Sequence, residues 1–79
     1  MTARALTPDE RIDWKHCQAC GYEVHSYLNP KPGSIERRWY WRRPYKIKGR
    51  IGMVPSTKDF PTRQAAIRDA IKKNKEATP

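Results

Sequence analysis

The sequence has little apolar material. Only 37% of its 79 residues are hydrophobic, and its mean hydropathy is −1.01. No apolar run approaches the roughly 20 residues that a membrane-spanning helix needs, and no apolar segment of the signal-peptide kind follows Met1. We therefore expect one small cytoplasmic domain without a membrane partner, in a bacterium or a phage-infected cell.

Acidic residues and cysteines are also scarce. Eight Asp and Glu against 17 Lys and Arg leave a net charge of +9 and a pI near 10.0, which indicates an acidic partner surface. Two cysteines in a cytoplasm are expected as thiols or metal ligands rather than as a structural disulfide. No Ser-His-acid set, catalytic carboxylate pair or glycine-rich phosphate loop occurs, so we expect no enzymatic activity.

What the sequence does contain is a basic and aromatic segment, residues 36–50, which supplies +6 of the net charge. Side chains two apart share a face of an extended strand, so this segment has two different faces. One face should carry the apolar set Ile35, Trp39, Trp41, Tyr45 and Ile47. The other should carry Arg38, Tyr40, Arg42, Lys46, Lys48 and Arg50. We expect the two tryptophans in the core and the basic face against an anionic partner, with nucleic acid as the first candidate.

The amino-terminal half predicts a helix followed by a strand. Residues 1–6 are expected as a disordered leader, and Thr7, Pro8 and Glu10 form the pattern of an N-cap, a first-turn proline and a capping box. The helix should end between residues 14 and 20, with Gly21 as its stop.

Alternating and turn-forming residues predict three strands. A strand over residues 22–28 should be followed by a loop, because two prolines and a glycine occur within residues 29–34. The second strand should begin at about Ile35 and reach about Arg43. The chain can then reverse at residues 43–45 or at residues 48–49, and a third strand should end near residues 54–56.

The carboxyl-terminal segment predicts a helix over residues 62–74 with Thr62 as its N-cap. Its apolar stripe is expected to pack on the sheet and consists of Ala66, Ile67, Ala70 and Ile71. Arg68, Lys72 and Lys73 should face outward, and residues 75–79 should form a disordered tail. Residues 7–74 are therefore expected as a single α+β domain, in which a three-stranded antiparallel sheet packs on the carboxyl-terminal helix.

An Arg-Trp-x-Trp strand, a basic hairpin and the run Phe-Pro-Thr-Arg-x-Ala-Ala follow one another in this chain. Over about residues 35–74 the pattern resembles the arm-site-binding domains of phage-type tyrosine integrases and other DNA-binding domains built from three strands and a helix, including the plant ethylene-response type. The resemblance implies a sheet in the major groove with the helix behind it. The groove-facing set would be Arg38, Tyr40, Arg42, Lys46, Lys48 and Arg50. The helix-entry motif would be matched by Phe60, Thr62, Ala66 and Ala70.

The segment before the first strand contains Cys17-x-x-Cys20-Gly21, which resembles half of a zinc ribbon. With His25 and the adjacent His16, four zinc ligands can be counted. Two thiols that only pack, or a redox-active pair, are the alternatives. No cofactor is expected unless zinc is bound.

These patterns predict a small, non-catalytic protein of the phage or mobile-element type that binds nucleic acid, with duplex DNA favoured over RNA or single-stranded DNA. A free-standing accessory factor of the excisionase kind fits the length. The alternative is a phage-encoded inhibitor or adaptor that binds an acidic surface of a host protein, with or without a zinc-stapled cysteine segment.

Overall fold

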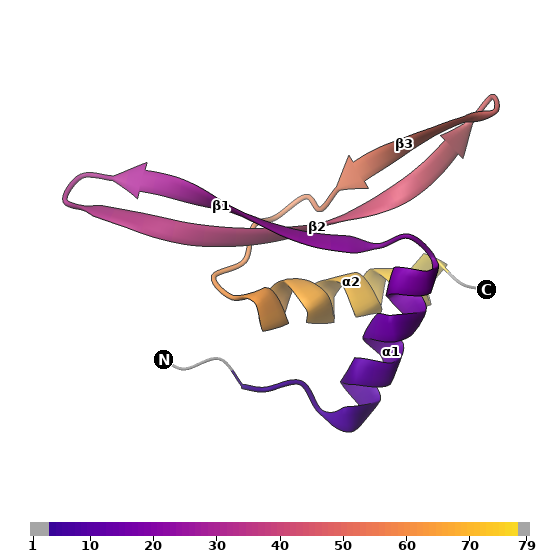
Figure 1. The fold of residues 1–79 in the computed structure, drawn as a ribbon, viewed down its shortest axis with the longest axis horizontal. Coiled ribbons are helices and arrows are strands. Elements are labelled where there is room, and N and C mark those ends of the chain that lie inside the picture. Colours follow the sequence, from indigo (N-terminus) through magenta and orange to yellow (C-terminus); the bar gives the residue numbers. More distant parts are fainter. Residues whose placement is uncertain (1–3, 78–79) are drawn as a thin grey trace.

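One antiparallel sheet and two helices on the same side of it make up the fold (Figure 1). The computed structural model describes residues 4–77, so the outermost residues of the expected leader and tail, 1–3 and 78–79, lie outside it. The elements are α1 (Pro8–Ala19), β1 (Glu23–Lys31), β2 (Ser34–Ile47), β3 (Arg50–Pro55) and α2 (Arg63–Ala77). Strand β2 lies between β1 and β3, and the predicted α+β class is confirmed.

Helix α1 begins and ends as the sequence predicts. The Thr7 hydroxyl accepts from the Glu10 amide at 3.2 Å, and the Glu10 carboxylate accepts from the Thr7 amide at 2.9 Å, so the capping box is complete. At the other end Gly21 has a φ of 96°. The amides of Gly21 and Tyr22 donate to the carbonyls of Gln18 and Cys17, which is the Schellman arrangement that ends a helix.

The first hairpin is longer than predicted. Pairing between β1 and β2 continues through Pro30, opposite Ile35, to Lys31, opposite Ser34, so the loop expected over residues 29–34 is wrong. Only Pro32 and Gly33 form the turn, and the φ of 79° at Gly33 after a proline fits a type II turn. Pro30 is tolerated because β1 is an edge strand, so a residue whose N–H would point away from β2 loses no hydrogen bond to a neighbouring strand.

The second hairpin reverses at the later of the two predicted positions. Ile47 pairs with Arg50 across a two-residue turn, in which Lys48 and Gly49 have φ angles of 50° and 79°. Two positive φ angles are typical of a type I′ turn, whose twist suits a hairpin. Because the turn has two residues, odd-numbered residues of β2 pair with even-numbered residues of β3. Arg50 therefore shares a face with Ile47, and its expected place on the basic face is wrong.

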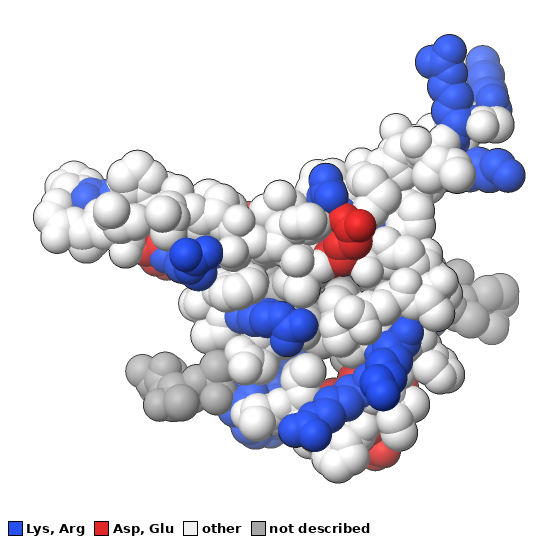
Figure 2. Space-filling view, viewed as in Figure 1, with Lys and Arg blue, Asp and Glu red and all other residues white. Residues whose placement is uncertain are grey.

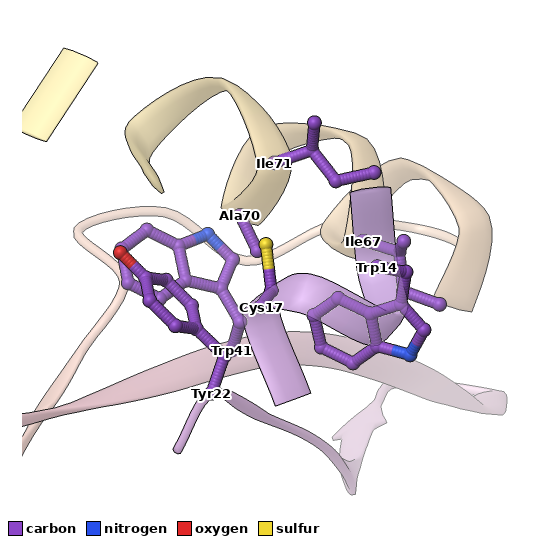
Figure 3. Close-up of a cluster of buried hydrophobic side chains, with 7 residues drawn as sticks. All are labelled: Trp14, Cys17, Tyr22, Trp41, Ile67, Ala70 and Ile71. Atoms are coloured by element: carbon purple, nitrogen blue, oxygen red, sulfur yellow. The ribbon is translucent and has the colours of Figure 1, made fainter. Parts of the chain in front are cut away.

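The core lies between the sheet and the two helices (Figure 3). Trp41 is 4% exposed and packs, as predicted, against α2, whose stripe of Ala66, Ile67, Ala70 and Ile71 is buried. Trp39, expected beside it, is only half-buried and lies outside the core cluster, where its backbone pairs with Phe60. Trp14 from α1 is the second tryptophan of the core.

Arg68 holds the amino-terminal segment against α2 instead of facing outward as expected. Its guanidinium donates to the Glu10 carboxylate at 2.6 Å and to the carbonyls of Arg4 and Ala5 at 3.0 Å. Leu6, expected in the disordered leader, is partly buried against the core. The contact therefore ties the beginning of the described chain to its last helix.

Both hairpins extend beyond the helices, which gives the molecule extents of 45 × 32 × 16 Å (Figure 1). The β1–β2 hairpin projects at one end and the β2–β3 hairpin at the other. Neither helix of residues 4–77 is long and apolar enough to cross a bilayer. We call the face of the sheet on which the helices pack the inner face, although they cover only its centre. The opposite face is the outer face.

Candidate nucleic-acid interface

The outer face collects most of the predicted basic set. Because Val24 and Trp41 pack into the core, their neighbours on β1 and β2 point to the other side of the sheet. Tyr40 therefore lies on the outer face at the middle of β2, opposite His25 of β1. The predicted residues that share this face are Arg38, Tyr40, Arg42 and Lys46.

A short row of aromatic rings lies at the centre of the outer face. The rings of His25 and Tyr40 are stacked, with centroids 5.7 Å apart and planes inclined by 27°. The centroid of the Tyr27 ring lies 6.1 Å from that of Tyr40. His25 and Tyr27 are two residues apart on β1 and therefore share a face. The sequence would have predicted their place beside Tyr40 if the register between β1 and β2 had been known.

Carboxylates occupy the same face and pair with its arginines. Glu23 accepts from the Arg42 guanidinium at 2.6 Å and lies 2.9 Å from the His25 imidazole, and these two contacts lower the pKa of Glu23, the histidine first. Glu36 binds Lys31 and Arg38, which likewise lower the pKa of its carboxyl. The central outer face is therefore charge-balanced rather than uniformly basic, which corrects the sequence-based expectation.

Asp59, from the segment between β3 and α2, completes this pairing. Its carboxylate accepts from the Tyr27 hydroxyl, a hydrogen bond that raises the pKa of Tyr27. Its backbone carbonyl accepts from the Arg38 guanidinium at 3.2 Å. The side chain of Arg38 is 25% exposed and that of Arg42 is 36% exposed, so both arginines are held in place and only partly available to a ligand.

The cations at the end of the β2–β3 hairpin are different. Lys46, Lys48 and Arg50 are exposed, and within residues 4–77 no carboxylate forms an ion pair with them. Figure 2 shows blue side chains gathered at this end of the molecule, well away from the red ones. We call residues 44–53 the β2–β3 ribbon. Its end is the strongest unbalanced positive feature of the sheet.

Apolar side chains are also exposed on the ribbon. Ile51 is 76% exposed, Ile47 57% and Tyr45 42%. Tyr45 and Ile47 lie on the inner face as predicted, but beyond the part that the helices cover. The Tyr45 ring lies over Gly52, where an added Cβ would be 2.6 Å from Cε1 of the ring. The apolar face expected from the sequence therefore forms part of the core at the centre of the sheet and is open to solvent at the ribbon.

The cysteine segment does not form the counted zinc site. Cys17 is 1% exposed within the core, where burial raises the pKa of its thiol, whereas Cys20 is exposed. His25 lies on the outer face of the sheet, on the far side from Cys17, and contacts Glu23 and Tyr40. Among residues 4–77 no three His, Cys, Asp or Glu side chains are grouped as metal ligands. Cys17, Cys20, His25 and His16 thus do not fit one tetrahedral ion in this arrangement, and packing describes Cys17 best.

Comparisons with known protein families, curated proteins and solved structures found no match. The resemblance to integrase arm-site-binding domains over residues 35–74 therefore stays a hypothesis. The shape, charge and exposure of its own surface are the observations that bear on what the protein binds.

Proposed function

We propose that the protein binds nucleic acid, duplex DNA in particular, with the β2–β3 ribbon as the main contact. The observation that carries the proposal is the combination of shape and charge at the ribbon, a projecting pair of strands whose three terminal cations have no acidic partner in the described chain. Phosphate contacts by such unpaired Lys and Arg side chains supply most of the sequence-independent affinity of DNA-binding proteins.

The dimensions of the ribbon favour a duplex. Two paired strands lie about 4.8 Å apart, and a two-stranded ribbon fits the major groove, which is about 12 Å wide. Four residue pairs, from Pro44 opposite Met53 to Ile47 opposite Arg50, project to the turn. At about 3.3 Å per residue they are roughly 13 Å long, so this part of the ribbon can lie in the groove with its outer face toward the base edges.

The individual residues then have separate tasks. Lys46, Lys48 and Arg50 contact phosphates on the two sides of the groove. Arg42 and Arg38, held by Glu23 and Glu36, contact the backbone nearer the body of the protein. Tyr40, between them on the outer face, is placed to donate a hydrogen bond to a phosphate or to stack on an unpaired base.

The test is a fluorescence-anisotropy titration with a labelled generic duplex and a single strand, each at two salt concentrations. The five cations assigned to phosphates would give a slope of log affinity against log salt of roughly −4.5. Replacing Lys46, Lys48 and Arg50 by Ser should make that slope less steep by about 2.7. The matched control replaces three exposed helix cations that have no ion pair in the described chain, Arg11, Lys15 and Lys72, and should change the slope much less.

Equal losses in the two triple variants would show that only net charge matters and would contradict a ribbon interface. Absence of binding to both nucleic acids at low salt would reject the proposal altogether. The basic ribbon would then be assigned to an acidic protein surface, and a pull-down with the wild-type protein and the ribbon variant would be the next experiment.

A further inference from the structure

Ile51 is the most exposed large apolar side chain among residues 4–77, with 76% of its surface open to solvent. It lies on the outer face of the ribbon, where it pairs with Lys46. The other exposed apolar side chains of the ribbon, Ile47 and Tyr45, lie on its inner face, so Ile51 is the apolar group that the outer face of the ribbon presents. A partner with an apolar group at this position would remove that surface from water, which is favourable.

The charges around Ile51 restrict what can cover it. Lys46 stands opposite it on β2, and Lys48 and Arg50 lie in and next to the turn. A complementary partner must therefore present negative charge at the periphery and an apolar group in the middle. The major groove of DNA has this layout, because phosphates line its edges and the C5-methyl groups of thymines project from its floor.

We infer that Ile51 contacts thymine methyl groups in the major groove, so that the ligand is DNA rather than RNA and thymine-containing steps are favoured. This inference rests on the proposed function, since it requires the ribbon to enter a duplex. Ile51 is one residue pair behind the turn-closing pair of Ile47 and Arg50, and the two-stranded ribbon is narrow enough to bring its outer face to the groove floor. An RNA duplex lacks the methyl group, and its major groove is too deep and narrow for the ribbon.

The two faces of the ribbon provide an internal control. Ile47 is the same residue type and is 57% exposed, but it lies on the inner face beside Arg50. A ribbon that presents its outer face to the groove floor directs Ile51 to the bases and Ile47 away from them. Both side chains are exposed, so serine at either position should leave the fold intact, which circular dichroism can check.

The experiment compares two duplexes that differ only in having thymine or deoxyuridine. Removal of one contacted methyl group should weaken wild-type binding about fourfold, the equivalent of about 0.8 kcal/mol. The variant Ile51→Ser should bind both duplexes equally, whereas Ile47→Ser should discriminate between them as the wild type does. A matching RNA duplex should bind more weakly than either.

Two results would overturn the inference while leaving the proposed function standing. These are equal wild-type affinity for the two duplexes, or loss of discrimination in Ile47→Ser instead of Ile51→Ser. If neither duplex binds, the proposed function itself fails. Binding instead to vesicles of phosphatidylserine and phosphatidylcholine, weakened equally by both serine variants, would assign the ribbon to an anionic bilayer and also reject the inference.

Discussion

At the residue scale, Gly21 is the position where a side chain is least compatible with the fold. It has a φ of 96°, and an added Cβ would lie 2.7 Å from Cγ of Pro44. We predict that Gly21→Ala lowers the free energy of unfolding by about 2 kcal/mol or more, because a positive φ alone costs alanine about 1–2 kcal/mol. Urea denaturation measures this loss.

The control for Gly21 is Gly33→Ala. Gly33 also has a positive φ, of 79°, but an added Cβ would contact nothing within 4 Å. Gly33→Ala should therefore lower the free energy of unfolding only by the cost of a positive φ for alanine, without a steric contribution. Equal losses at the two glycines would mean that the contact with Pro44 is unimportant.

The two cysteines should respond differently to the same substitution. Cys17→Ser places a hydroxyl group in the core and should lower the free energy of unfolding by about 1 kcal/mol or more. Cys20→Ser, on the surface, should change it by no more than about 0.5 kcal/mol. A chelator should leave the thermal unfolding midpoint unchanged. If both variants and the chelator destabilise the protein alike, a shared zinc ion holds the segment.

Single residues were predictable from the sequence where their role depends on near neighbours. The Thr7 cap and the apolar stripe of α2 need only spacings of three or four residues, so both were predicted correctly. Arg50 and Arg68 depend on segments far away in the chain. The face of Arg50 is set by the length of a turn, and the partner of Arg68 lies 58 residues away.

At the scale of elements, the ion pair between Glu10 and Arg68 joins α1 to α2. The Arg68 hydrogen bond, followed by that of the Thr7 amide, lowers the pKa of Glu10 from 4.5 to about 2. A carboxyl whose pKa is lower in the folded state stabilises the fold above its unfolded pKa, and this contribution is lost as the pH falls through the folded value. We predict that stability contributed by Glu10 declines between about pH 5 and pH 2.

Thermal unfolding of the wild type and of Glu10→Gln at several pH values measures that contribution. The variant should be less stable at pH 7 and should depend less on pH below 5, with a residual dependence from Glu23 and Glu36. Glu76→Gln is the control, because its pair with Lys73 is exposed and lies within one helix. Parallel pH profiles for wild type and Glu10→Gln would contradict the prediction.

Lys48, in the turn of the β2–β3 ribbon, should affect both the stability of the protein and its binding to DNA. Lys48 has a φ of 50°, which is unfavourable for lysine and tolerated better by asparagine. We predict that Lys48→Asn raises the free energy of unfolding by up to about 1 kcal/mol. The same variant should make the salt slope of duplex binding less steep by about 0.9, since one phosphate contact is removed. Denaturation and salt titration of one preparation test both, and an unchanged slope would remove Lys48 from the interface.

The elements themselves were predicted well, with two exceptions. Helix α2 continues to Ala77, through the first residues of the expected disordered tail, and at one hairpin pairing overrides local preference. Proline and glycine near residue 30 indicate a loop, yet the edge position of β1 lets the strand continue through Pro30. The alternation of β2 correctly separates Trp41 from Arg42. It does not show that Glu23 and Glu36 share the face of the arginines, because that depends on the register between strands.

At the scale of the whole molecule, the core stabilises the centre of the sheet and leaves its ends dependent on single hairpins. Trp41 lies beneath α2, whereas the β2–β3 ribbon projects beyond both helices (Figure 1). We predict that the amides of Tyr45 and Gly52, which pair across the ribbon in the alternation set by its two-residue turn, exchange with solvent about tenfold faster, or more, than that of Trp39, which donates to the Phe60 carbonyl. Hydrogen exchange followed by NMR measures this difference, and uniform protection along β2 would contradict it.

The net charge was evident from the sequence, but the distribution that matters for binding was not. Seven basic residues within residues 36–50 suggest one continuous cationic face. Folding neutralises the arginines at the centre of the sheet and leaves unpaired cations at the ribbon end. That separation depends on which strands become neighbours, so composition alone could not show it.

The length of β2 has a mechanical consequence. This one strand of 14 residues takes part in both hairpins and crosses the core between them. A pull on the ribbon end would therefore be transmitted along one continuous strand to Trp41. If the ribbon is held by a large ligand, motion of that ligand acts through this strand on the core of the protein.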